Sequence, residues 1–334
     1  MNVALALLLG CRIEVGAPAG GAAVDAGLGT SEHPVEVWIY TSMYQEVLDA
    51  LTPDLTAALP GVRVQWFQAG SEKVAQRWEA ETEAGGSRAC LLATSDPGWY
   101  EDLARRGALR AYVSPRALEL PRAWVRPTHA AFRVSLMVLA ANGEAPPSFA
   151  ALAEPAWKGR FSTPDPLSSG TMFTTLAALE HTLGDAWLAS ARGNGWVAAG
   201  GNSAVVARMQ SGEAPVGVVL LENLLAQEGY AEGTPGVARP NLAAGAIPVP
   251  GPIAITTGCT APAAAEAVED WLLSPVAQAH IVAGRMHSPF PGAPAPAHAP
   301  ALADVELLPL PDDFAARTAT RANALRARWN ELGG

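Results

Sequence analysis

The chain has 334 residues, 49% of them hydrophobic and 16% charged, so it can bury a large core and is too long for one compact set of layers. The formal net charge is −10, and the only lysines are Lys73 and Lys158. This argues against a nucleic-acid partner, because phosphate binding needs clustered basic side chains. We therefore expect two lobes and no nucleic acid.

The N-terminal segment resembles a lipoprotein signal. Residues 3–9 are apolar, and their last two residues begin the stretch Leu8-Leu9-Gly10-Cys11. A Gly/Ala-rich spacer covers residues 16–29. The apolar run is too short to span a bilayer, and no Lys or Arg precedes it, so the positively charged start of such a signal is missing. We predict that residues 1–33 are a lipoprotein signal and flexible spacer and that Cys11 carries the lipid. The protein would then lie in the periplasm or cell envelope and touch the membrane only through this anchor.

Strand-like and helical segments alternate in the first third of the chain. The expected strands cover residues 35–41, 62–67 and 89–94, and the expected helices cover 46–59, 71–84 and a short segment that closes at Gly107. Pro60-Gly61 and Gly85-Gly86 end the first two helices. Strands and helices that alternate at this length predict an α/β fold with a doubly wound parallel sheet.

Two long apolar runs, at residues 131–142 and 247–257, are expected to cross between the lobes. The expected strands between them cover residues 160–163, 195–199 and 216–221, with helices beginning at residues 169 and 203. The C-terminal part predicts one long amphipathic helix over 263–284 with Trp271 and Leu272 inward, a proline-rich linker over 289–311 and a last helix over 314–332. We predict that residues 34–133 and 248–290 form lobe I, and that residues 134–247 and 291–334 form lobe II.

Small or hydroxyl-bearing residues occupy four junctions where a strand-like run meets a helical one. The junctions are Thr41-Ser42, Gly70-Ser71-Glu72, the stretch from Ser168 to Thr171, and Gly200-Gly201-Asn202-Ser203. A helix start leaves backbone N–H groups unpaired and carries the positive end of the macrodipole, so it suits an anionic group. One such junction by itself is also explained by a plain capped helix. Four of them predict a ligand cleft at the C-terminal ends of the strands.

The cysteines and histidines show no spacing that is typical of a metal site or a catalytic site. Cys90 and Cys259 lie far apart in apolar surroundings without CxxC or Cys/His spacing, which favours two buried free thiols over a metal site or a disulfide. The six histidines lie mostly beside Pro, Gly or Ala, and neither GxSxG nor HExxH occurs. We expect a protein that is not an enzyme and has no cofactor, with an envelope hydrolase as the alternative.

Five segments, in their order along the chain, resemble the extracellular solute-binding proteins of ABC importers. They are 37–42 (VWIYTS), 155–160 (PAWKGR), 165–171 (DPLSSGT), 212–217 (GEAPVG) and 270–278 (DWLLSPVAQ). The similarity is to the subgroup that holds ferric-ion, thiamine and aminoethylphosphonate binders, and it covers about residues 35 to 330. It implies a two-lobed fold of the type II periplasmic-binding-protein kind, with doubly wound sheets and a ligand cleft between the lobes. It also implies a monomer that closes on its solute and presents it to an ABC permease.

The resemblance further implies where a ferric ion would be held. Ferric binders of the family use a His after the first strand, a Glu after the third, and two adjacent Tyr after the strand that corresponds to residues 216–221. In this chain those places fall on Tyr44, on Ser95 or Asp96, and on Glu222-Asn223. Without the tyrosine pair, the hard anionic ligands that a ferric ion prefers are missing. We expect no metal, and a ferric-ion-binding protein of the same family is an alternative.

The favoured function is capture of a small polar solute that is anionic or zwitterionic. Hydroxyl and N–H groups for it are expected from Ser42, Gly70, Ser71, Ser168, Ser169, Gly170, Thr171, Asn202 and Ser203. Charge, stacking and further hydrogen bonds are expected from Tyr44, Ser95, Asp96, Trp99, Arg133, Glu222 and Asn223. We expect the anionic group at Ser169-Gly170-Thr171 and a cationic group at Glu222, whose carboxylate would repel a simple oxyanion.

Overall fold

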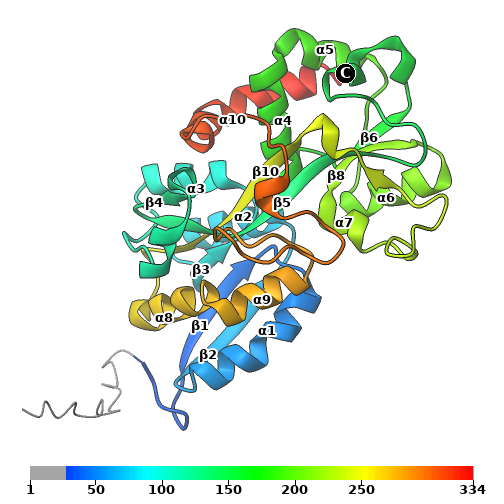
Figure 1. Ribbon diagram of the computed structural model, residues 1–334. Coiled ribbons are helices and arrows are strands. Elements are labelled where there is room, and N and C mark those ends of the chain that lie inside the picture. The colour runs from blue at the N-terminus through cyan, green and yellow to red at the C-terminus, as the bar shows by residue number, and fades with distance from the viewer. Residues whose placement is uncertain (1–27, 334) are drawn as a thin grey trace, which may run out of the picture.

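The structure of the chain, a computed structural model, describes residues 28–333. The predicted signal up to residue 27 and the predicted lipidation site Cys11 lie outside the described residues. The two predicted lobes are present and are joined by long strands through the middle of the molecule, as Figure 1 shows.

One mixed sheet runs through both lobes in the strand order β2-β1-β3-β10-β5-β8-β6-β7, and β4 and β9 pair with β5. The strands are β1 (Val35–Thr41), β2 (Val62–Gln68), β3 (Ala89–Ala93), β4 (Val125–Arg126), β5 (His129–Ala141), β6 (Phe161–Thr163), β7 (Val197–Ala198), β8 (Val216–Leu220), β9 (Arg239–Pro240) and β10 (Ala246–Ile255). The outer strands of each lobe are parallel, as predicted, whereas β10 is antiparallel to β3 and β5, and β5 is antiparallel to β8.

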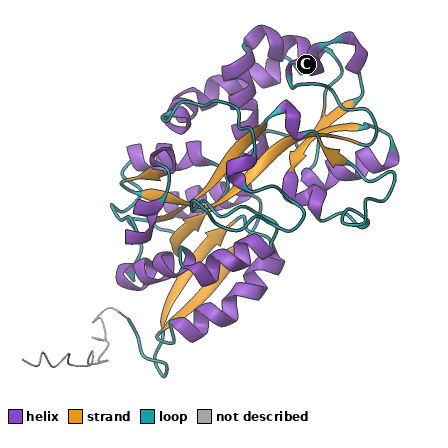
Figure 2. Cartoon of the chain, in the orientation of Figure 1, coloured by secondary structure: helices purple, strands orange, loops and turns teal. Residues whose placement is uncertain are grey.

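Helices cover both faces of the sheet, as Figure 2 shows. They are α1 (Gln45–Ala58), α2 (Ser71–Glu83), α3 (Pro97–Arg105), α4 (Gly170–Leu183), α5 (Asp185–Gly193), α6 (Asn202–Ser211), α7 (Leu221–Leu225), α8 (Pro262–Leu272), α9 (Pro275–Ala283) and α10 (Phe314–Glu331). Short 3-10 helices lie at Pro115–Glu119, Arg122–Trp124, Ala150–Ala153, Pro155–Trp157, Leu242–Ala244 and Leu302–Asp304. The apolar stripe of α1, from Val47 to Leu55, is buried against lobe I, as its helical spacing predicts.

The strands β5 and β10 are the two crossings that the long apolar runs predicted. All 13 residues of β5 are buried, because both of its faces are covered. This explains why its sequence is almost continuously apolar. Its first part pairs with lobe I, where Ala130 opposes Ile253, and its last part, Met137 to Ala141, pairs with β8. Arg133 and Ser135 therefore lie at the point where the chain passes from one lobe to the other.

The predicted long helix over residues 263–284 is wrong in one respect, because two helices, α8 and α9, occupy it. Pro275 cannot donate the backbone hydrogen bond that a continuous helix needs, so it starts a new helix. Ser274 caps this new helix, since its side chain accepts a hydrogen bond from the Ala277 N–H. Leu272 is buried as predicted, whereas Trp271 is only half-buried.

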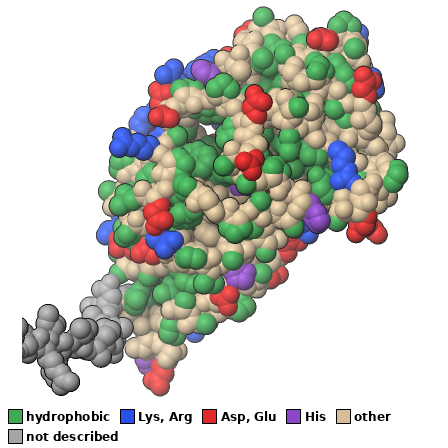
Figure 3. Space-filling model, viewed as in Figure 1, with side chains coloured by type: hydrophobic (Ala, Val, Ile, Leu, Met, Phe, Trp, Pro, Cys, Tyr) green, Lys and Arg blue, Asp and Glu red, His purple; other side chains and the backbone are tan. Residues whose placement is uncertain are grey.

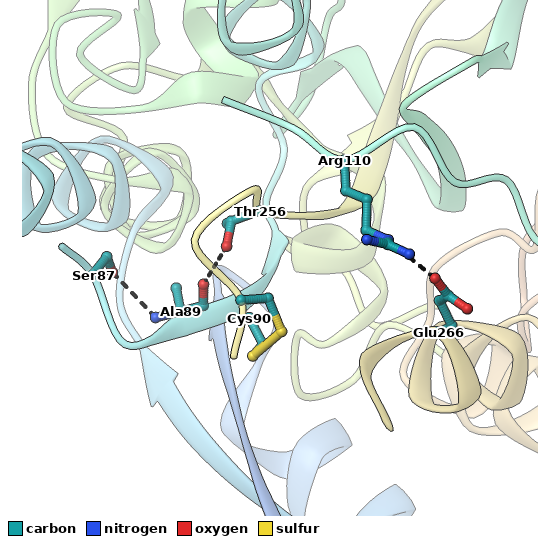
Figure 4. Close-up of a disulfide and its surroundings, with 7 residues drawn as sticks. Ser87, Ala89, Cys90, Arg110, Thr256 and Glu266 are labelled. Carbon is teal, nitrogen blue, oxygen red and sulfur yellow. Dashed lines mark hydrogen bonds and ion pairs between the residues drawn. A yellow bond between two sulfur atoms is a disulfide. The ribbon is translucent and has the colours of Figure 1, made fainter. Parts of the chain in front are cut away.

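The predicted free thiols are also wrong. Cys90 on β3 and Cys259 in the turn after β10 form a disulfide, although 169 positions separate them in sequence. β3 and β10 are adjacent antiparallel strands, and the Thr256 N–H donates to the carbonyl oxygen of Cys90 at 2.9 Å, so the turn is brought against β3. Figure 4 shows Thr256, Ala89 and the disulfide side by side.

The surface of residues 28–333 carries side chains of both charges, as the composition implies. No helix of residues 28–333 is long and apolar enough to cross a membrane. Acidic and basic side chains are interspersed on the face seen in Figure 3, and the same face is hollowed where the lobes meet. An apolar cavity of about 330 Å³ is bordered by Trp124, Pro248 and Phe314.

Candidate functional site

A cleft of about 200 Å³ lies where the two lobes meet at the C-terminal ends of the parallel strands. Its lining residues are Ser42, Tyr44, Gly70, Ser71, Ser95, Arg133, Ser168, Ser169, Gly170, Thr171, Gly201, Asn202 and Leu220. Eleven of these belong to the sixteen predicted site residues; Asp96, Trp99, Ser203, Glu222 and Asn223 do not line the cleft. Parallel strands bring their carboxyl ends to one edge of a sheet, which is why distant junctions meet here.

Three helices direct their N-termini at this cleft. The helix α4 is capped by Ser169, whose side-chain oxygen accepts from the Met172 N–H at 3.3 Å. The caps of α2 and α6 are Gly70 and Gly201, and neither helix has a side-chain cap. Their first-turn N–H groups therefore lack side-chain acceptors, and three positive macrodipole ends converge on one cavity.

Arg133 forms the floor of the cleft and is only 3% exposed. One terminal nitrogen donates to Ser135 Oγ at 3.0 Å, and the other donates to Ser95 Oγ and, at 3.3 Å, to Ser42 Oγ. No carboxylate among residues 28–333 forms an ion pair with it, and its Nε has no hydrogen-bond partner there. Burial lowers the pKa of the guanidinium, and the nearby Glu222 carboxylate partly offsets this. The cation is therefore bound by neutral acceptors, which are three hydroxyls and the Met286 sulfur.

Glu222 lies behind this floor, at the start of α7. It is 4% exposed, and its Oε1 accepts from Ser135 Oγ at 2.7 Å, so Ser135 links it to Arg133. Burial raises the pKa of the Glu222 carboxyl above its ordinary value, while the Ser135 hydrogen bond and the Arg133 charge oppose that shift. Glu222 was predicted to hold a cationic group of the solute, but it does not line the cleft, because its carboxylate is hydrogen-bonded to Ser135 behind the floor.

Tyr44 and Asn223 join the lobes beside the cleft. The Tyr44 hydroxyl donates to Asn223 Oδ1 at 3.2 Å. Asn223, which was predicted to contact the solute, is therefore bonded to Tyr44 instead. Burial, followed by the Glu222 charge, raises the pKa of the Tyr44 phenol well above its ordinary value. Tyr44 therefore stays protonated at neutral pH and acts as a hydrogen-bond donor.

Asp96 lies in a neighbouring cavity of about 430 Å³ between α10 and lobe I, together with Trp99, Glu72 and Arg326. Its side chain caps α3 by accepting from the Trp99 N–H at 3.1 Å. Burial, and then the Glu72 charge, raises the pKa of Asp96 to about 6. The carboxylate is thus destabilised at neutral pH, and neither it nor the Trp99 ring borders the solute cleft.

Asp96→Asn should stabilise the protein at neutral pH and much less in acid. The stability linked to a raised carboxyl pKa is present below the ordinary value and is lost as pH rises through about 6, whereas Asn keeps the cap without the charge. We expect the gain in unfolding free energy over the parent to grow by roughly 2 kcal/mol between about pH 4.5 and pH 7.5. Urea titrations at both pH values measure this, and an equal gain at both would contradict it.

The two lobes are in contact around the cleft. Arg326 of α10 reaches Glu72 of α2 at 3.2 Å across the interface. Gly170 at the start of α4 packs so closely on lobe I that a Cβ added there would lie 3.0 Å from the Cβ atoms of Ser71 and Asp96. The structure therefore has the lobes closed.

Several residues of the site were missed from the sequence. Ser135 is two positions after Arg133 on a strand, so the alternation of side chains could have placed both on one face. Leu220 lines the cleft by its position in the fold, and Gly201 belongs to a junction that the sequence indicated but was not counted among the ligand residues. No local pattern indicates that Arg326 would reach Glu72, 254 positions earlier.

Comparisons with known proteins agree with this architecture. The sequence profile of the bacterial extracellular solute-binding proteins matches residues 35–283. Iron-bound HitA from Pseudomonas aeruginosa is 18% identical, with a TM-score of 0.77 over 90% of this chain and 100% of its own. AfuA from Actinobacillus pleuropneumoniae, bound to fructose-6-phosphate, is 19% identical, with a TM-score of 0.73 over 89% and 98%.

A third structure, the ferric binding protein from Campylobacter jejuni, is 17% identical, with a TM-score of 0.75 over 89% of this chain and 99% of its own. A search of curated protein sequences found no match. At these identities the solved structures support the fold alone.

Proposed function

The chain belongs to the family of bacterial extracellular solute-binding proteins, and from this premise we propose that it captures a small anionic or zwitterionic solute for an ABC importer. Solute-binding components of this kind bind small molecules outside the cytoplasm and deliver them to a membrane permease. The proposal concerns the chemistry of the cargo and the residues that hold it.

The observation that carries the proposal is the charge balance of the cleft. Arg133 is buried there with hydroxyl groups and the Met286 sulfur as its partners, and the N-termini of α2, α4 and α6 point at the same cavity. No Asp or Glu is among the residues that line it. A buried cation without a carboxylate partner is costly, so an anionic solute that pairs with it is strongly favoured.

A ferric ion is the other cargo that the comparisons suggest, because HitA and the Campylobacter protein are described as iron-binding. Tyr44 is the single tyrosine that lines the cleft, and its raised pKa disfavours the tyrosinate form. We therefore propose an organic or inorganic anion as the favoured cargo and a ferric ion as the alternative cargo.

The mode of action that we propose is closure of two lobes about β5 and β10. Lobe I would consist of residues 34–133 and 248–290, and lobe II of residues 134–247 and 291–334. The solute would bind to an open form and be enclosed when Tyr44 meets Asn223 and Gly170 meets Ser71. We propose that the protein acts as a monomer and performs no catalysis on its cargo.

For location, we propose the periplasm or cell envelope with a lipid on Cys11. The disulfide between Cys90 and Cys259 supports an oxidising compartment, because cytoplasmic thiols are kept reduced. Cys11→Ala should then release the protein from the membrane fraction of the cells that produce it. Unchanged membrane association would contradict the anchor.

Mass spectrometry of the purified protein tests the proposed function. Protein isolated from the cell envelope without refolding should carry a stoichiometric small anion that is released unmodified on denaturation. Recovery of iron in its place would favour the ferric alternative, and release of a chemically changed product would favour the hydrolase. Protein in which Arg133 is replaced by Met is the matched control and should carry no anion.

A further inference from the structure

We propose that the cavity between α10 and lobe I is a second binding site and that it takes a small primary ammonium ion. This side cavity has a volume of about 430 Å³, and its walls come from α2 and α3 on one side and from α4 and α10 on the other. None of the described residues lines both the side cavity and the solute cleft. The inference therefore does not depend on which cargo the cleft holds.

The ionisable side chains that line the side cavity pair with one another, with one exception. Arg326 pairs with Glu72 at 3.2 Å, and Arg105 pairs with Asp102. Asp96, the cap of α3, forms no ion pair with any of residues 28–333. The side cavity therefore carries one negative charge that no side chain of this part of the protein neutralises.

Burying this charge without a cation is costly. Asp96 is only 7% exposed, and the N-terminus of α3 stabilises its carboxylate only in part. Burial and the Glu72 charge still raise the pKa of Asp96 to about 6. A singly charged ligand cation beside the carboxylate would offset this cost.

A second group in the side cavity lacks a partner. Thr318 on α10 is 6% exposed, and its Oγ1 has no hydrogen-bond partner within the part of the chain that the structure describes. A Cβ added to Gly98 would lie 3.4 Å from both Asp96 Oδ1 and Thr318 Cγ2, so the carboxylate and the threonine border one small gap. Buried polar atoms without a partner are rare, and the unbonded hydroxyl is therefore an independent sign of a ligand.

The two acceptors determine the class of ligand. Carboxylate and hydroxyl oxygens both accept hydrogen bonds, and a primary ammonium has three N–H groups to donate. The Trp99 and Phe173 side chains also line the side cavity and can cover an alkyl chain on the nitrogen. A divalent metal fits less well, because residues 28–333 contain no group of three His, Cys, Asp or Glu that could hold one.

Calorimetry with n-butylammonium, tetramethylammonium and potassium chlorides tests the site at about pH 8, where Asp96 is ionised. n-Butylammonium should bind at one site. Tetramethylammonium should bind at least tenfold more weakly, because it has no N–H to donate. Potassium should also bind more weakly than n-butylammonium, because it has no alkyl group to bury against the aromatic side chains.

Two variants remove the acceptors one at a time. Asp96→Asn should weaken n-butylammonium binding by about tenfold to a hundredfold, because it removes the charge and keeps the helix cap. Thr318→Val should weaken it about tenfold without lowering the stability of the ligand-free protein, because its hydroxyl has no partner among the described residues to lose. Asp304→Asn is the matched charge control, since Asp304 is exposed and does not line the side cavity. It should bind like the parent.

Gly98→Ala tests the position of the ligand without changing any charge. Its methyl group would fill the gap beside Asp96 at ordinary contact distances, so the fold should tolerate it, while n-butylammonium should bind at least tenfold more weakly. Gly193→Ala is the matched control, because a Cβ added there meets no atom within 4 Å. It should leave the affinity unchanged.

Each contrary result overturns a defined part of the inference. Binding that survives both Asp96→Asn and Gly98→Ala would place the ammonium outside the side cavity. Tetramethylammonium or potassium that binds as tightly as n-butylammonium would overturn the assignment to a primary ammonium. No heat with n-butylammonium at millimolar concentration would refute the site itself. All of these results leave anion capture in the cleft untouched, because the two sites share no lining residue among those described.

Discussion

Removal of the Cys90–Cys259 disulfide should lower the free energy of unfolding by about 3 to 5 kcal/mol. The two cysteines are 169 positions apart, so the cross-link closes a very long loop and restricts the unfolded chain strongly. It also joins β3 to the end of β10, the strand that returns the chain to lobe I. Urea titration of a Cys90→Ser/Cys259→Ser variant measures the loss, and the melting temperature should fall by roughly 10 °C.

A reducing agent provides the control for this change. It should lower the stability of the parent toward that of the double variant and leave the double variant unchanged. Cys90→Ser and Cys259→Ser as single variants should each match the double variant. Parent protein that loses no stability on reduction would contradict the expected role of the disulfide.

Gly170→Val should prevent closure of the lobes and weaken binding of the co-purifying solute by roughly a hundredfold. Gly170 begins α4 in lobe II, and a Cβ there would lie 3.0 Å from the Cβ atoms of Ser71 and Asp96 in lobe I. Two further methyl groups cannot be placed without separating the lobes, because closely packed interfaces tolerate little added volume. Small-angle scattering with the solute should show compaction of the parent and none of the variant.

Gly193→Val in lobe II is the matched control. Gly193 ends α5, and a Cβ added there meets no atom within 4 Å. The control should bind and compact like the parent, while both variants should keep nearly parental stability against urea. If Gly170→Val bound the solute as tightly as the control, closure at Gly170 would not be required for binding.

Tyr44 takes part both in the contact between the lobes and in the lining of the cleft. Tyr44 is bonded to Asn223 across the two lobes, and Tyr44 also lines the cleft. Under the proposed closure mechanism, the solute would complete a surface that only the closed form presents, and a permease could distinguish loaded from empty protein by it.

The secondary structure was largely predictable because its signals are local. The alternating run of residues 35–41 is β1, and the apolar stripe from Val47 to Leu55 is buried in α1. The break at Pro275 was present in the sequence but was outweighed by the apolar pattern on both sides of it. Proline at the first position of a helix, preceded by a capping serine, is the signal that should have decided it.

The sequence alone determined that the chain is a two-lobed α/β protein with a polar cleft between its lobes. Four glycine- or hydroxyl-rich strand ends, such as Gly70-Ser71 and Asn202, sufficed for this, because parallel strands must present their carboxyl ends at one edge. Most of the eleven predicted residues that line the cleft do so for that reason, whereas Arg133 reaches it from within β5.

Only the tertiary structure decided how the charged and sulfur-bearing groups are paired. Cys90 meets Cys259, and Glu222 turns to Ser135, through contacts between segments far apart in sequence. A buried charge goes to the partner that packing brings within about 3 Å, and no local pattern encodes that distance. The orientation of the Asn202 amide was settled in the same way, because its Oδ1 accepts from the N–H of Leu220 on β8.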